Sequence, residues 1–256
     1  MNDFWINPGQ QPQIITDTPS YLVLYKPPCM HTAPLTAGEE NTLLNWAASL
    51  YPGIVKIQGK KPIEGGLVHR LDYETHGLVL CAKTQKIYED FMLMQKAGHI
   101  IKEYDAASSV SPSSISSLKN IDKTNTIIQS AFRPFGKGRK AVRPLEPDHV
   151  LAAGKTIYQT EILCCRDIKN TSYFRLRIKK GFRHQIRCHL AWIGRPLFND
   201  FLYGSCDNIQ PDTNTMQSKA GIFLALRASS IAFCDPVTGN PVEAALPETV
   251  PCPMEC

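Results

Sequence analysis

Apolar and polar positions follow two different periods along the chain, and each period predicts a kind of element. A run of apolar residues bounded by turn formers, or an apolar residue at every second position, is typical of a β-strand. Phe174, Leu176 and Ile178 alternate with polar neighbours, which predicts a strand with one apolar and one basic face. Such patterns predict strands at residues 21–26, 77–83, 102–107, 155–163, 173–179, 221–226 and 230–234.

Three segments have the helical spacing of apolar residues. The first follows Asn41 as its N-cap and ends before Pro52, the second spans residues 85–97 and is closed by Gly98, and the third spans residues 183–193. Strands outnumber helices, and several are joined by short turns. We therefore expect an α+β fold with a mixed, mostly antiparallel sheet flanked by helices and loops.

A polar stretch interrupts these patterns. Residues 108–117 contain seven serines, and the polar composition continues to residue 125. So little apolar surface cannot offset the entropy of ordering the chain. Because strand-like sequence resumes beyond it, we interpret residues 108–125 as a flexible insertion in a single domain over residues 21–246. Residues 1–20 are then an N-terminal extension, and residues 247–256 a C-terminal tail.

Composition excludes several classes of protein. With 43% hydrophobic and 20% charged residues, the chain is neither disordered, collagen-like nor a coiled coil. The nine cysteines are scattered without a CxxC pair, which favours thiols in a reducing cytosol over a zinc ribbon or a redox site. No signal peptide and no apolar run of about 18 residues is visible, so we expect a cytoplasmic protein without a membrane segment.

Reactive side chains concentrate at residues 64–77, between two apolar segments. This stretch holds two histidines, one arginine and three acids, among them His69, Arg70 and Asp72. Polar groups at this density before a buried strand are typical of a site loop on a rigid scaffold. The alternative is a solvated turn in which Asp72 caps a local backbone N–H.

Two further segments carry candidate chemistry. Lys102 and Tyr104 lie two apart on one face of a predicted strand, where a surface lysine beside a core-edge tyrosine is the simpler interpretation. Arg183 and Arg187 lie four apart, which places them on one face of the third predicted helix. Between residues 166 and 187 there are eight Lys or Arg and one acid, although the whole chain has a net charge of only +5.

Together these segments resemble the RluA-type pseudouridine synthases. The strings His69-Arg70-Leu71-Asp72, Lys102-Glu103-Tyr104 and His184-Gln185-Ile186-Arg187 have the order and approximate spacing of that family. Lys26-Pro27, Gly194-Arg195-Pro196 and Asp200-Phe201-Leu202-Tyr203-Gly204 are similar to it as well. The resemblance covers most of the chain, and it implies a pseudouridine-synthase-type catalytic domain.

The resemblance implies an enzyme that isomerises uridines in structured RNA, such as rRNA or tRNA, without a metal or a cofactor. It assigns the catalytic carboxylate to Asp72, acting on the sugar as nucleophile or as base, and insertion into the RNA after base flipping to Arg70. It assigns the partner of that carboxylate to Arg187 and the residue beside the uracil to Tyr104. It also implies RNA or substrate contacts, which we assign to His69, Lys102, Arg183 and His184.

The basic stretch at residues 133–143 fits this RNA partner. It carries five cations and no acid, and we interpret it as a mobile arm. Cations on such an arm suit contacts to RNA phosphates, which position the RNA without reading its sequence. We assign these contacts to Arg133, Lys137, Arg139 and Lys140. A merely solvated loop is the alternative.

The chain departs from the family at three positions, where His76 replaces Ser, Phe182 replaces Arg and Arg227 replaces His. We expect no S4 RNA-binding module before the domain, since about twenty residues precede the first strand, and we expect a monomer. Two rival functions remain. One is a non-catalytic RNA-binding or ribosome-assembly protein on the same fold, and the other is a zinc hydrolase using His184 and His189, whose spacing differs from that of HExxH.

Overall fold

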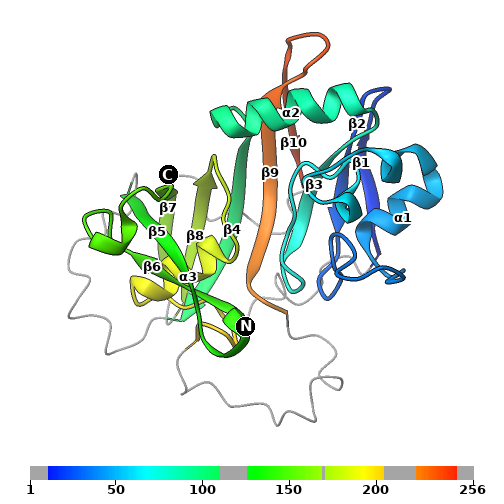
Figure 1. Cartoon of the computed structure of the whole chain (residues 1–256). Coiled ribbons are helices and arrows are strands. Elements are labelled where there is room, and N and C mark those ends of the chain that lie inside the picture. The colour runs from blue at the N-terminus through cyan, green and yellow to red at the C-terminus, as the bar shows by residue number, and fades with distance from the viewer. Residues whose placement is uncertain (1–10, 110–125, 169–170, 205–222, 247–256) are drawn as a thin grey trace. The chain divides into compact units, whose positions relative to one another are not determined.

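The computed structural model describes residues 11–109, 126–168, 171–204 and 223–246 (Figure 1). The chain forms two compact units. The first unit comprises Asn7–Glu103 and Arg227–Thr249, and the second contains Tyr104–Leu226. Most of the predicted serine-rich insertion, residues 110–125, lies outside the described residues, as do residues 1–10 and the tail at 247–256.

The first unit contains a sheet whose strands follow the order β1-β2-β3-β9-β10. Its pairs are antiparallel except that of β3 with β9, which is parallel and joins His76 to Arg227 and Gly77 to Ala228. The elements of this unit are β1 (Gln13–Asp17), β2 (Tyr21–Lys26), α1 (Leu43–Leu50), η2 (Pro52–Lys56), η3 (Pro62–Glu64), β3 (His76–Ala82), α2 (Gln85–Ala97), β9 (Leu226–Cys234) and β10 (Pro241–Ala245).

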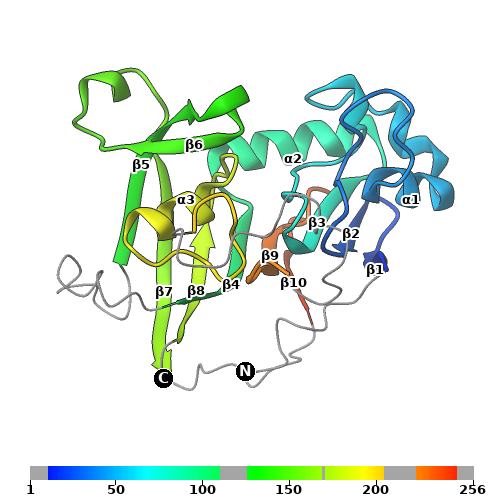
Figure 2. The ribbon, with the colours of Figure 1, turned by 90° about the horizontal axis from the view of Figure 1, so that it is seen from below.

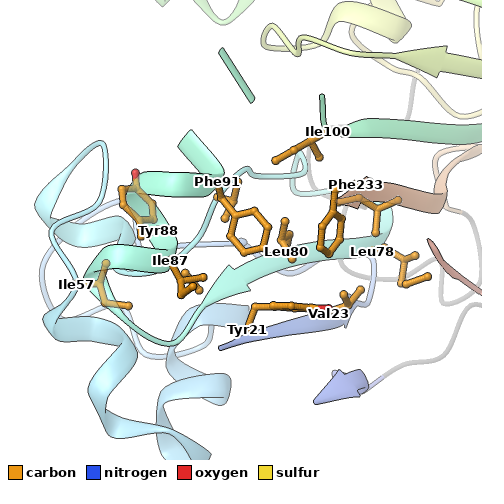
Figure 3. Packing of buried hydrophobic residues seen from close by; sticks show 14 residues of the cluster. Tyr21, Val23, Ile57, Leu78, Leu80, Ile87, Tyr88, Phe91, Ile100 and Phe233 are labelled. Carbon is orange, nitrogen blue, oxygen red and sulfur yellow. The ribbon is translucent and has the colours of Figure 1, made fainter. Parts of the chain in front are cut away.

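Helix α2 covers one face of this sheet and closes its core (Figure 3). The Phe91 ring from α2 meets Tyr21 of β2 and Phe233 of β9 edge to face, with centroids 5.6 and 5.3 Å apart. Such pairs add to the free energy gained from burying the rings. The helix ends at Gly98, whose φ of 82° lies in the left-handed region, as the sequence predicts.

The second unit contains a sheet with the strand order β4-β8-β7-β5-β6, together with an α-helix (Figure 2). Strand β4 begins in the first unit, because the boundary between the units lies after Glu103. The pairs β5–β6, β5–β7 and β7–β8 are antiparallel. The elements are β4 (Ile101–Ser109), β5 (Thr126–Phe135), η5 (Lys137–Arg139), β6 (Ala141–Leu145), η6 (Val150–Ala152), β7 (Tyr158–Ile168), β8 (Thr171–Ile178) and α3 (Gln185–Trp192).

The predicted α+β class with a mixed, mostly antiparallel sheet is confirmed, and several details are corrected. The N-cap of α1 is Thr42 rather than Asn41, because the Thr42 hydroxyl accepts a hydrogen bond from the Asn45 N–H. The two late strands are one strand, β9, which begins at Leu226. Residues 221 and 222 lie outside the described residues. Strands β1, β5, β6 and β10 were not predicted.

The basic stretch at residues 133–143 is a β-hairpin, so its prediction as a mobile arm is wrong. Strands β5 and β6 pair from Ala131–Leu145 to Phe135–Ala141, and the short helix η5 forms the turn. The Arg143 guanidinium lies 3.6 Å from the centroid of the Phe135 ring. Backbone hydrogen bonds between β5 and β6 order this segment, although the pattern of its polar side chains does not predict a strand.

Within the described parts of the chain, no helix is both long and apolar enough to cross a membrane.

Candidate active site

Hydrogen bonds to its backbone groups hold the loop that carries Asp72 in place. Residues 66–68 run beside β3, with hydrogen bonds from the Val68 N–H to the Leu80 carbonyl and from the Ala82 N–H to the Gly66 carbonyl. Beyond them, the buried Thr32 hydroxyl donates to the Leu71 carbonyl at 2.8 Å and accepts from the Leu71 N–H at 3.1 Å. The residue before Asp72 is therefore held at both backbone groups, and the half-buried Asp72 stands at a defined place.

A buried lysine lies under the same loop. The Lys26 ammonium donates to the carbonyl oxygens of Pro27, Met30 and Tyr73, at 2.9, 2.7 and 3.2 Å. Burial lowers the pKa of Lys26 to about 7, and the nearby charge of Asp72 opposes that shift. Lys26 thus joins the end of β2 to the residue after Asp72, and its protonated form places a positive charge near the carboxylate. The sequence pointed to it only through the Lys26-Pro27 pair.

His69 and Lys102 come together in the first unit. Burial and the Lys102 charge hold the pKa of His69 well below its usual value, so the ring is neutral at pH 7. Its Nε2 accepts the Leu80 N–H at 3.2 Å, which leaves the ring hydrogen on Nδ1. Burial lowers the pKa of Lys102 to about 8. Lys102 is therefore buried, and its interpretation as a surface lysine is wrong.

Arg70 projects from the base of this loop. Its side chain is about half exposed, while its Nη1 lies 3.3 Å from an oxygen of the buried Glu64. Glu64 was not among the predicted site residues. About half of the Arg70 side chain thus remains accessible to solvent while the contact with Glu64 holds its end.

Tyr104 and Arg187 belong to the second unit, and both are buried. Arg187 donates from Nε and Nη2 to the two carboxylate oxygens of Asp200, at 2.8 and 2.9 Å. Such a two-bond contact fixes the plane of the guanidinium as well as its position. Asp200 was predicted only as part of a family string. The predicted contact of Arg187 with Asp72 stays a prediction.

The predicted basic face of the third helix is wrong. Helix α3 begins at Gln185, and His184 before it has a φ of 56°, so Arg183 lies outside the helix. Arg183 Nη2 donates to the carbonyls of Arg139 and Ala141, at 2.8 and 3.3 Å. Arg183 therefore braces the turn of the β5–β6 hairpin, while Arg187 points into the protein.

The zinc alternative fails at His189. Its Nε2 lies 2.9 Å from the Ser130 hydroxyl and its Nδ1 lies 2.8 Å from the Thr160 hydroxyl. Both ring nitrogens are thus engaged in the interior. Among the residues that the structure describes, no three His, Cys, Asp or Glu side chains are grouped to hold a metal ion.

His189 predicts a pH dependence of stability. Burial lowers its pKa to about 4, from an ordinary value of 6.5, so its contribution is complete above pH 6.5 and is lost as the pH falls through 4. Between pH 7 and pH 4 we expect this one group to lower the free energy of unfolding by about 3 kcal/mol. Chemical denaturation of wild type and His189→Gln between pH 7 and pH 4 measures the slope of the free energy of unfolding against pH in each protein. His149→Gln, at an exposed histidine, is the control, and equal slopes in all three proteins would contradict the assignment.

Residues 20–192 match the RNA pseudouridylate synthase family. The chain belongs to this family. It is 29% identical over 231 residues to "Ribosomal large subunit pseudouridine synthase D" of Blochmanniella floridana, covering 88% of this chain and 65% of the relative. The protein of the same name from Haemophilus influenzae is 28% identical, with 92% and 67% covered. The chain thus spans about two thirds of the length of these relatives.

Solved structures of other family members share the fold. Human RNA Pseudouridylate Synthase Domain Containing 1 superposes with a TM-score of 0.67 at 18% identity, covering 94% of this chain and 86% of the human chain. Human RNA Pseudouridylate Synthase Domain Containing 4 gives 0.60 at 17% identity, with 91% and 87% covered. These similarities establish the pseudouridine synthase fold.

The three residues at which this pseudouridylate synthase departs from the family pattern have defined neighbours in the structure. Phe182 stacks on Phe132 of the hairpin, with ring centroids 4.9 Å apart and planes 4° apart. His76 lies opposite Arg227 in the β3–β9 pair. Burial, together with the charges of Arg227 and Lys26, lowers the pKa of His76 to about 3. Two of the three departures, His76 and Arg227, are therefore neighbours, and the buried His76 is neutral at pH 7.

Proposed function

We propose that the protein is an RNA pseudouridine synthase whose catalytic domain spans residues 21–246. The match of residues 20–192 to the RNA pseudouridylate synthase family is the observation that carries this proposal. The fixed loop around Asp72, with the Lys26 charge near it, supports it. The rival is a non-catalytic RNA-binding protein on the same fold, which would bind RNA but would not isomerise uridine.

The reaction needs no group donor. The bond between uracil N1 and ribose C1′ breaks, the base turns, and a bond forms between C5 and C1′. The C5 proton then leaves to restore the ring, and N1 takes up a proton, so no atom is gained or lost overall. Asp72 is the proposed carboxylate that acts on the sugar, as nucleophile at C1′ or as base for a sugar proton. Tyr104 is the proposed group beside the uracil and Arg187 the proposed cationic partner in catalysis. A unit charge pair at 4 Å contributes about 4 kcal/mol at an effective dielectric of 20.

The uridine must leave its stack before the base can turn, which costs a few kcal/mol and less in loops or bulges. Arg70 is the proposed residue that takes its place, and its half-exposed guanidinium tied to Glu64 suits that role. His69, Lys102 and His184 are proposed to contact the substrate. Of these, Lys102 supplies a buried amine beside a neutral imidazole.

The β5–β6 hairpin is the proposed phosphate-binding surface. Among its exposed cations, Arg133 lies on the paired strand β5, while Lys137, Arg139 and Lys140 lie in the turn that Arg183 braces. Less entropy is therefore lost when they bind than on an unstructured arm. Contacts of this kind position RNA, and their strength falls with salt. Both curated relatives are named for the ribosomal large subunit, which makes large-subunit rRNA the first substrate to test, with tRNA next.

Tritium release tests the function. RNA transcribed with uridine labelled at C5 is expected to release tritium to water in the presence of the protein, because the C5 proton is lost during isomerisation. Mapping of pseudouridines in total RNA with and without the protein then identifies the position. Binding of structured RNA without any release of tritium from rRNA or tRNA would support the non-catalytic rival instead.

A further inference from the structure

Asp200 is the centre of a buried set of contacts next to Arg187. Besides its two bonds from Arg187, one carboxylate oxygen accepts the N–H groups of Leu202 and Tyr203, each at 3.1 Å. The Gly204 N–H closes the turn on the Asp200 carbonyl at 2.7 Å. The side chains of both Arg187 and Asp200 are almost fully buried. Asp200 thus holds Arg187 from a turn that is itself tightly constrained.

Tyr203 extends these contacts to the hairpin. Its hydroxyl accepts the Val142 N–H of β6 at 2.8 Å and lies 3.1 Å from His184 Nδ1. Since the hydroxyl oxygen accepts from Val142, its hydrogen is available to His184. Burial raises the pKa of Tyr203 to about 12, so the phenol keeps this hydrogen at pH 7.

The hairpin side of the link is the outer edge of the sheet. Strand β6 is last in the strand order of the second unit, and Val142 lies opposite Pro134 in the hairpin. The Val142 N–H points away from β5 and donates to the Tyr203 hydroxyl. The Cys188 thiol of α3 also donates to the Val142 carbonyl, at 3.5 Å. A displacement of β6 would therefore act on the turn that carries Asp200 and, through Cys188, on helix α3.

Stability alone is a weak reason for this arrangement. A buried ion pair contributes little more than well-packed apolar residues of the same volume, because both charges lose their hydration. A planar two-bond contact does, however, restrict the orientation of a guanidinium. The continuous path from the hairpin through Tyr203 and Asp200 to Arg187 is consistent with a role in orienting Arg187.

We propose that Asp200 and Tyr203 are positioning residues for Arg187, and that RNA contact at the β5–β6 hairpin is transmitted to Arg187 through the Tyr203 hydroxyl. The inference rests on the proposed function, in which Arg187 serves the reaction and the hairpin binds RNA.

Tyr203→Phe removes the bridging hydroxyl and keeps the ring. We expect its single-turnover rate of tritium release at saturating RNA to fall about tenfold, because an error in placement of less than 1 Å has effects of this size. The dissociation constant for RNA should stay within twofold. Tyr158→Phe is the matched control, since it removes a hydroxyl from the same unit and keeps the ring against Phe132 and Phe182. This control should react at the wild-type rate.

A second pair of variants tests the link to the hairpin. Lys140→Gln in the wild-type background should weaken RNA binding and also lower the saturating rate. In the Tyr203→Phe background, Lys140→Gln should weaken only RNA binding, because the hydroxyl that connects the hairpin to Tyr203 is already absent. Asp200→Asn should lower the saturating rate more than Tyr203→Phe does, and Asp200→Glu, which keeps the charge, should recover part of it.

The outcomes separate the inference from the function on which it rests. Wild-type rates in Tyr203→Phe, or equal effects of Lys140→Gln in both backgrounds, would overturn the inference while the enzyme stays a pseudouridine synthase. A lower melting temperature with an unchanged rate per folded molecule would also overturn it. No tritium release from the wild type would overturn the proposed function, and the inference with it.

Discussion

Replacing Asp72 by Asn is expected to lower tritium release from C5-labelled RNA by at least about a thousandfold. The amide has nearly the shape of the carboxylate but no charge, so it is a poor nucleophile and a poor base. Asp72 is only half buried, and the Thr32 hydroxyl holds the backbone at Leu71 independently of the Asp72 side chain. The fold and the affinity for RNA should therefore survive, and the loss should appear in the single-turnover rate.

Glu74→Gln is the matched control for this substitution. It neutralises an exposed acid two residues further along the same loop and should leave the rate within about twofold of wild type. Full activity of Asp72→Asn would remove Asp72 from the catalytic role. A comparable loss in Glu74→Gln would mean that the charge of the loop matters and not the position of Asp72.

The second large effect is expected at Gly77, where β3 meets β9. A Cβ on Gly77 would lie 2.2 Å from the Ala228 carbonyl oxygen and 2.6 Å from the Ala228 nitrogen, and the φ of Gly77 is +123°. Both contacts involve backbone, which cannot move without separating the strands. We expect Gly77→Ala to lower the free energy of unfolding by about 4 kcal/mol or more, since a steric conflict and an unfavourable φ add together. Urea denaturation measures it.

Gly53→Ala is the control for Gly77→Ala. No atom lies within 4 Å of the Cβ that it would add, so its stability should be unchanged or raised by a few tenths of a kcal/mol. Equal stabilities of the Gly77 and Gly53 variants would mean that the close approach of Gly77 to Ala228 does not constrain the sheet. Because Gly77 lies five residues after Asp72, partial folding of the Gly77 variant should also reduce tritium release.

Local patterns were sufficient where an element is decided by its own residues. Strand β2 and helix α2 have the bounds that the sequence predicts, because a run of buried residues ends at prolines in one case and a helical stripe ends at Gly98 in the other. Strands β5 and β6 were missed because the cations on their exposed residues resemble a loop. Their order comes from pairing, which depends on residues elsewhere in the chain.

For the candidate site, too, the sequence predicts some features, and others depend on tertiary contacts. The proposed catalytic positions of Asp72, Tyr104 and Arg187 follow from short strings of residues, because those strings resemble the family in order and approximate spacing. The residues that hold these segments in place cannot be identified from the same strings, because they come from other parts of the chain. Thr32 reaches Leu71 across 39 residues, Lys26 reaches Tyr73 across 47, and Asp200 reaches Arg187 across 13.

The sequence by itself determined the fold class, the family resemblance and the residues proposed for catalysis, because periodicity and motif order are properties of the chain. Only the tertiary structure decided which of the cations are buried, which are held by carbonyl groups and which face solvent. Arg187 and Lys102 are buried, Arg183 is engaged by hairpin carbonyls, and Arg139 and Lys140 face solvent. Burial and hydrogen bonding depend on neighbours that are distant in the sequence. Lys and Arg side chains with the same charge therefore have different environments in the folded protein.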